Sequence, residues 1–137
     1  EVSEQDLAEV YHLLSLLESD AAAVAATRAS DAEMRELQAL HAELEAAVGD
    51  REKFFPINER FHMRLLELAG IRWRNQMDAD LRKVMKLNRH HSLLKSGRIE
   101  DSLAEHRLVM KALERRDSQD AMRRMQEHFR NGLEAAG

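Results

Sequence analysis

The sequence contains no cysteine, and this absence removes three kinds of chemistry at once. A disulfide framework, a zinc ion bound by thiolates and a cysteine nucleophile all require that residue. Any metal ion in this protein must therefore be bound by nitrogen and oxygen atoms.

Residues that favour sheets, and apolar runs that cross membranes, are scarce as well. The chain of 137 residues has one proline, five glycines and 4% aromatic residues, whereas strands draw on aromatic and β-branched residues. No apolar run approaches the roughly 20 residues needed to span a bilayer, and no signal segment opens the chain. We therefore expect a cytoplasmic, all-α protein without a membrane partner, with residues 1–137 forming one domain.

A surplus of positive charge is also missing, because the formal net charge is −4. Surfaces that bind nucleic acids are usually basic, with the charges clustered. If the protein acts on DNA, we expect the contact to be made by a segment outside these residues.

Apolar residues recur at helical spacing in six segments, which short polar breaks separate. Ser30 and Glu33 have the capping-box pattern at one helix start. Pro56 either kinks the third helix or marks its true start near Ile57. Six helices with short connections predict an antiparallel bundle of six to seven helices. The expected helices cover about residues 4–29, 31–49, 50–70, 72–94, 99–115 and 118 to beyond 133.

Three of the seven histidines fall on the apolar faces of different predicted helices. They are His62, His106 and His128, and Asn58 lies one turn before His62 on the same face. Each buried imidazole must find partners for both ring nitrogens, and one shared divalent ion would supply them. These four donors suit zinc, nickel or another first-row transition metal. The alternative is that each histidine is an ordinary hydrogen-bonded core residue.

The other four histidines have polar neighbours or lie near a helix end, and we expect them to be solvated or partly buried. They are His12, His41, His90 and His91.

Three short stretches around the candidate ligands also form a recognisable set: Asn58-Glu59-Arg60-Phe61-His62, Glu105-His106 and Gln126-Glu127-His128. The set resembles the D/N-x-x-F-H, E-H and H pattern of the FCD domain, the C-terminal part of FadR-subfamily GntR regulators. The resemblance implies a metal- and effector-binding domain rather than an enzyme. It further implies a homodimer that binds a small organic acid, and a winged helix-turn-helix domain, absent from this chain, that contacts DNA.

Two departures from the family pattern bear on the ligands. Many relatives carry an arginine one turn before the glutamate that resembles Glu18, whereas this chain has Leu13 and Leu14 in that region. An acidic effector thereby loses one expected anchor. Asn58 stands where aspartate is commoner, and a neutral amide adds no negative charge, so an anionic effector is better tolerated.

Two arginines of the fourth predicted helix, Arg82 and Arg89, are candidates for binding the effector. They lie two turns apart on one face, and guanidinium groups suit the two-point geometry of carboxylates. The alternative is a solvated basic stripe paired with Asp78 and Asp80.

Two other functions are compatible with a helical bundle. The Glu-x-x-His pairs that end at His12 and His62 match the motif that di-iron enzymes repeat on two helices. A helical interaction module without any ligand site is the second alternative. Metal content separates the three hypotheses, at about one ion per chain for the regulator, about two for the enzyme and none for the module.

Overall fold

The computed structural model describes residues 2–88 and 91–137, and this part of the chain is helical without any strand. The fold is therefore the predicted all-α antiparallel bundle, with six helices and one short 3₁₀ turn, η1, in the described ranges. The elements are α1 (Glu4–Arg28), α2 (Asp31–Ala46), α3 (Arg51–Ala69), α4 (Arg72–Leu87), η1 (Ser92–Leu94), α5 (Arg98–Glu114) and α6 (Ser118–Ala136).

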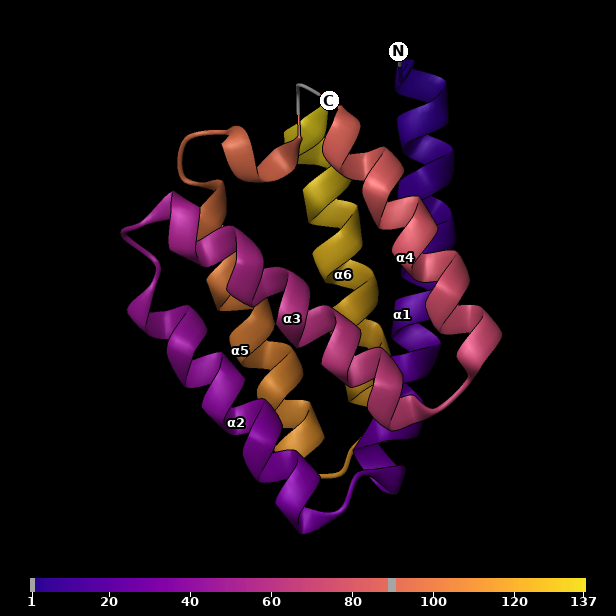
Figure 1. Ribbon diagram of the computed structural model, residues 1–137, viewed down its shortest axis with the longest axis vertical. Helices are drawn as coiled ribbons and strands as arrows, with labels where there is room; N and C mark the ends of the chain where they lie inside the picture. Colours follow the sequence, from indigo (N-terminus) through magenta and orange to yellow (C-terminus); the bar gives the residue numbers. More distant parts are fainter. Residues whose placement is uncertain (1, 89–90) are drawn as a thin grey trace.

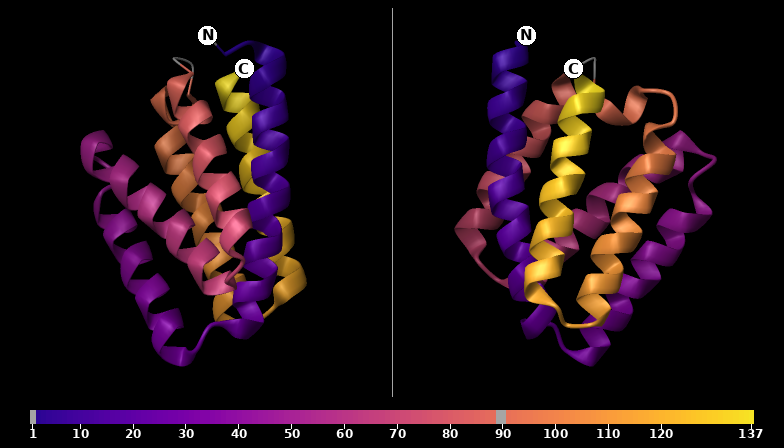
Figure 2. Two further views of the ribbon diagram at one scale, coloured as in Figure 1. Left: turned by 45° about the vertical axis from the view of Figure 1, so that its right-hand side comes forward. Right: turned by 180° about the vertical axis from the view of Figure 1, so that it is seen from behind.

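Two long antiparallel helices, α1 and α6, pack against each other along their length (Figure 1). The helix α5 packs on the other side of α6, and α3 crosses obliquely over this layer (Figure 2). The two remaining helices lie outside, with α2 on α3 and α5, and α4 on α1 and α3. Within the described residues, no helix is both long and apolar enough to cross a membrane.

Local signals in the sequence fix most of the helix ends. Ser30 and Glu33 form the predicted capping box at the start of α2. The side chain of Asp50 accepts a hydrogen bond from the amide of Lys53, so α3 begins at Arg51 and Pro56 lies inside it. A start near Ile57 is therefore wrong, because the Asp50 cap already satisfies the first turn.

The fourth helix is shorter than the sequence pattern predicts. It ends at Leu87 rather than at residue 94, and the chain then turns inward through η1, which packs on α5 and α6. Leu93 thereby reaches an apolar cluster with Leu44, Phe54 and Leu103. The sequence between Leu87 and Gly97 contains no glycine or proline that would mark the end of the helix. Apolar spacing alone therefore predicted a helix that is too long.

The main core lies between α1, α3, α5 and α6, and it contains both apolar and polar side chains. Its fully buried apolar members include Leu14, Phe61, Leu65, Ala112 and Leu113. Polar side chains from the same four helices are buried beside them: Glu18, Asn58, His62, His106 and His128. This arrangement positions the candidate site.

Candidate metal centre

The three predicted histidines converge in the core from three different helices. His62 comes from α3, His106 from α5 and His128 from α6, and their exposed fractions are 1%, 1% and 8%. One ring nitrogen of each lies within 4.8 Å of those of the other two. The histidines are thus placed as a metal ion would require.

The closest pair of ring nitrogens has the separation expected of two ligands on one ion. The Nε2 atoms of His62 and His106 are 3.3 Å apart. Two nitrogens that each lie about 2.0–2.1 Å from a tetrahedral zinc ion are roughly 3.3 Å from one another. Without a shared proton or ion, two lone pairs would face each other at this distance. The geometry therefore fits a metal ion between the rings.

Two carboxylates, one fully buried and one partly buried, orient two of the histidines. Glu18 Oε1 lies 2.5 Å from His62 Nδ1, and Glu105 Oε1 lies 2.5 Å from His128 Nδ1. A proton on each Nδ1 donated to the carboxylate leaves the Nε2 lone pair free to bind a metal. Carboxylates of this kind commonly hold metal-binding histidines in place.

Asn58 supplies an oxygen atom that has no other use in the described part of the chain. It lies one turn before His62 on α3, is 5% exposed and lines the central cavity. Its Oδ1 atom accepts no hydrogen bond from any described residue. Since a buried polar atom without a partner costs free energy, this oxygen suits a fourth metal ligand.

Burial keeps two of the histidines in the neutral form that binds metal ions. It lowers the pKa of His106 well below its ordinary value, and the neighbouring His128 and His62 lower it further. It also lowers the pKa of His128 to about 4, although the hydrogen bond with Glu105 acts in the opposite direction. Both imidazoles are therefore neutral at physiological pH, as metal coordination requires.

A small cavity adjoins the centre. Its volume is about 30 Å³, and its lining includes Tyr11, Asn58, Arg82 and His128. This space holds an ion or about one water molecule, whereas pockets for small organic molecules usually exceed roughly 300 Å³. An organic acid can therefore enter only if lining side chains move.

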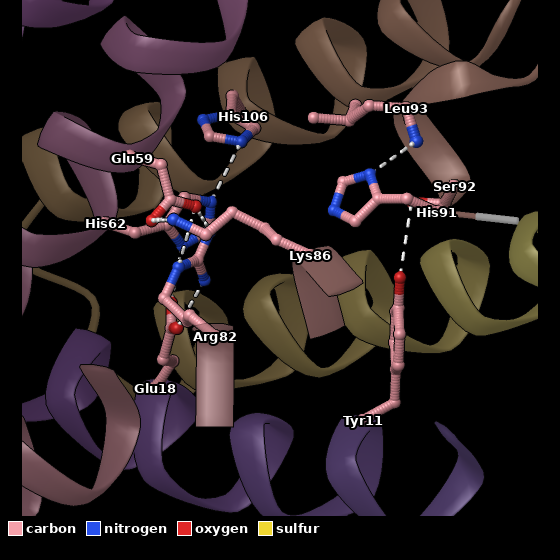
Figure 3. A network of polar contacts seen from close by, with 10 residues as sticks. All are labelled: Tyr11, Glu18, Glu59, His62, Arg82, Lys86, His91, Ser92, Leu93 and His106. Carbon is pink, nitrogen blue, oxygen red and sulfur yellow. Dashed lines mark hydrogen bonds and ion pairs between the residues drawn. The ribbon is translucent and has the colours of Figure 1, made fainter. Parts of the chain in front are cut away.

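Arg82 is buried at the edge of this cavity and is held by two carboxylates (Figure 3). Its Nη1 atom donates to Glu18 Oε2 at 2.7 Å, and its Nε and Nη2 atoms donate to Glu59 Oε1 at 3.0 and 2.8 Å. With an exposed fraction of 2%, Arg82 does not belong to a solvated basic stripe, so that alternative is wrong for this residue. Arg89, the second predicted arginine, lies outside the described residues.

A second buried arginine at the cavity could not be predicted from the sequence. Arg98 is the first residue of α5, is 4% exposed and holds both oxygens of Glu105 at 2.7 Å. Because it lies where one helix ends and another begins, no periodic pattern marks it as inward. Glu18 did carry a signal, since it lies at helical spacing between the buried Leu14 and Ala21.

One of the four remaining histidines is more deeply buried than expected. His91 is 7% exposed and lines the cavity, and its Nδ1 atom accepts a hydrogen bond from the amide of Leu93 at 3.3 Å. The inward turn after α4 buries it. The structure does place His12 at the surface and His41 in a partly buried position, whereas His90 lies outside the described residues.

The two Glu-x-x-His pairs do not form a di-iron site. Glu9 and His12 are both exposed on α1. Glu59 binds Arg82 and, through Oε2 at 3.3 Å, the ammonium group of Lys86. The glutamates of the two motifs are therefore not gathered with both histidines, as a di-iron centre requires.

A second buried carboxyl group, that of Asp78 on α4, lies close to Glu18. Burial raises the pKa of Asp78, and the negative charge of Glu18 raises it further, to about 9. Burial would also raise the pKa of Glu18, but Arg82 and His62 outweigh it and hold that pKa well below the usual range. Asp78 is therefore protonated at neutral pH while Glu18 is ionised.

The raised pKa of Asp78 predicts how stability depends on pH. Between the ordinary aspartate pKa of about 3.9 and the raised value, the folded chain holds a proton that the unfolded chain releases, so stability falls as the pH rises. Asp78→Asn removes this loss. We expect a gain in the free energy of unfolding that grows with pH by up to about 1.4 kcal/mol per unit.

Urea unfolding of the metal-free protein at pH 5, 6.5 and 8 measures this gain, with the exposed Asp80→Asn as the matched control. Because all variants share the titrations of the other groups, the difference between them isolates Asp78. A gain that does not change with pH would show that Asp78 is ionised in the folded chain.

Comparison with known proteins supplies an independent assignment of the family. The sequence profile of the FCD domain matches residues 9–131. Comparison with curated proteins gives no significant match.

Two solved structures share the fold. E. coli McbR/YncC superposes with a TM-score of 0.88 at 21% identity, over 99% of this chain and 66% of the other. Streptococcus agalactiae GntR superposes with a TM-score of 0.79 at 25% identity, over 93% of this chain and 58% of the other. This chain thus spans about two thirds or less of the length of these two proteins.

Proposed function

The chain belongs to the FCD domain family of GntR-type transcription regulators, and we propose on that premise that residues 1–137 sense a small organic acid through a bound divalent metal. Members of this family are regulatory domains rather than enzymes. A separate winged-helix domain, N-terminal to these residues, would make the contacts with DNA. The observation that carries the proposal is the convergence of three histidine nitrogens beside the unpartnered oxygen of Asn58.

The proposed metal ligands are Asn58, His62, His106 and His128, and the proposed ion is zinc, with nickel or another first-row metal as alternatives. All four ligands are neutral. The two nearby carboxylates do not offset the charge of the ion, because Arg82 pairs with Glu18 and Arg98 with Glu105. A bound ion would therefore act as a Lewis acid that favours an anionic oxygen as its next ligand.

We expect the purified protein to contain about one divalent ion per chain. His106→Ala should remove the ion together with the thermal stabilisation that it provides, because an ion that binds only the folded state stabilises that state. The exposed His12→Ala is the control and should keep both. Elemental analysis after reloading with zinc measures the content, and well under half an equivalent would contradict the proposal.

The proposed effector is a small carboxylate whose second polar end is held by Arg82 and, beyond the described residues, by Arg89. Since Arg82 already binds Glu18 and Glu59, the acid must displace one of these carboxylates as it enters. Glu59 is the more easily displaced, because it is 26% exposed whereas Glu18 is fully buried.

Replacement of Arg82 and Arg89 by methionine should weaken acid binding more than tenfold, about 1.4 kcal/mol, while the metal stays bound. Calorimetry with mono-, di- and aromatic carboxylates on the zinc-loaded protein measures this. Arg107→Met is the control, since Arg107 pairs with Glu45 on the outer face of α5 and α2. If no acid binds the loaded protein, the sensing role fails and the metal is structural.

We further propose a homodimer formed through α1 and α4. The outer face of α4 exposes Trp73 (68%) and Met77 (54%), and the neighbouring α1 exposes Leu13 (43%) and Leu16 (53%). Apolar side chains gathered on adjacent helices are typical of an interaction surface. A second copy of the chain is the partner that the family suggests.

Sedimentation should then detect a dimer at tens of micromolar, a rough working range for such interfaces. Met77→Glu should shift the protein towards the monomer of 15.8 kDa, because it buries a charge in the interface. Leu108→Glu changes an exposed leucine of α5 instead and should leave the dimer intact. A monomeric wild-type protein would contradict the proposal.

The regulatory mechanism that we propose is linkage between the acid and the dimer arrangement. An acid that binds one arrangement more tightly shifts the population towards it. The spacing of two attached DNA-binding domains would change with it. Because half-sites on DNA lie about one helical turn apart, DNA affinity depends on that spacing.

A further inference from the structure

The helix α4 carries none of the proposed metal ligands, yet it is joined to one of them by two successive polar contacts. Arg82 of α4 donates to Glu18 of α1 at 2.7 Å, and the other oxygen of Glu18 lies 2.5 Å from His62 (Figure 3). The side chains of these residues are 3%, 0% and 1% exposed. Water therefore cannot replace either contact without opening the core.

Polar contacts of this kind hold much of α4 to the bundle. Its inward face carries the buried Arg74, Asp78, Arg82 and Met85, and the apolar Leu81 and Val84 are only partly buried against the core. Its outward face exposes Trp73. Most amphipathic helices have the opposite arrangement, with the apolar face inward. The position of α4 thus depends on its buried charged contacts as well as on apolar packing.

An ion on Nε2 of His62 would strengthen the link to α4. Metal binding withdraws electron density from the imidazole, and its Nδ1–H group then makes a stronger hydrogen bond to Glu18. That bond fixes the carboxylate in the orientation in which its second oxygen accepts from Arg82. Without the ion, the ring of His62 has only the nitrogen of His106 opposite its Nε2 atom, and Glu18 is held less firmly.

We propose that Glu18 and Arg82 are positioning residues that transmit the state of the metal centre to α4. Metal loading fixes α4 on the bundle and so orders the outward surface that bears Trp73 and Met77. This inference rests on the metal binding proposed above and extends it, because it names the route by which the buried centre acts on the surface.

Hydrogen exchange of the metal-free and the zinc-loaded protein tests the route. We expect zinc to slow exchange in α4 at least tenfold more than in α2, a difference of about 1.4 kcal/mol in opening free energy. The helix α2 is a fair reference, since it too lacks ligands but packs on the ligand-bearing α3 and α5. Trp73, the one tryptophan of the chain, gives a second readout through acrylamide quenching of its fluorescence.

Arg82→Met should bind about one zinc ion but lose the slowing that is specific to α4, because the three histidines remain while the link is cut. Its zinc affinity should fall by about the same factor, since coupling between two sites is reciprocal. Arg74→Met is the matched control. Arg74 lies on the same face of α4 and pairs with Asp20, which is exposed, so this variant should keep the zinc response.

If Arg82→Met fails to fold, a variant of Glu59, the more exposed partner of Arg82, still tests the route. Glu59→Gln weakens the other partner of Arg82 but leaves the contact with Glu18, so zinc should still slow exchange in α4. Loss of the response in this variant would assign the coupling to Glu59 and overturn the proposed route.

The remaining outcomes separate the two proposals. If the wild-type protein binds no zinc, both the proposed function and this inference fail. If zinc binds and Arg82→Met keeps the slowing specific to α4, the metal site stands and the link is wrong. Equal slowing in α2 and α4 of the wild type would also overturn the link, because it would reflect general stabilisation of the fold.

Discussion

The burial of three imidazole rings in one helical core imposes a requirement that much of the structure meets. Each ring nitrogen removed from water needs a partner, and two rings obtain one from a carboxylate. A carboxylate that is fully buried, as Glu18 is, or partly buried, as Glu105 is, costs free energy unless it is paired, and each of these two is held by a buried arginine. The two resulting hydrogen-bond networks are His62–Glu18–Arg82 and His128–Glu105–Arg98.

These two networks contain much of the charge found inside the bundle. The third histidine differs from the other two. His106 has no carboxylate of its own, and its Nδ1 atom has no partner among the described residues. Its Nε2 atom faces that of His62. An ion between the two Nε2 atoms would satisfy both of them and would give the Oδ1 atom of Asn58 a partner. Because the two nearby carboxylates are already paired with arginines, an ion at this centre would keep its positive charge and would favour an anionic ligand.

The parts of this arrangement that follow periodic patterns could be predicted from the sequence. The helix class, the capping box at Ser30 and the inward positions of the three histidines all depend on spacing within one helix, and the structure agrees with them. Arg98 and His91 could not be predicted in this way, since both lie in the connection between α4 and α5 or at its end. Their burial depends on how that connection turns, which is decided by packing across the bundle.

Periodicity also divides α4 into two faces without saying which one lies inward. Apolar residues usually mark the buried side of a helix. In α4, however, Arg74 and Arg82 are buried and Trp73 is exposed. Arg82 lies inward because the buried Glu18 of α1 requires a partner from α4. That requirement is invisible until α1 and α4 are side by side. Because Arg82 lies inward, Trp73 and Met77 are left exposed, so the buried ion pair and the proposed dimer surface have one physical origin.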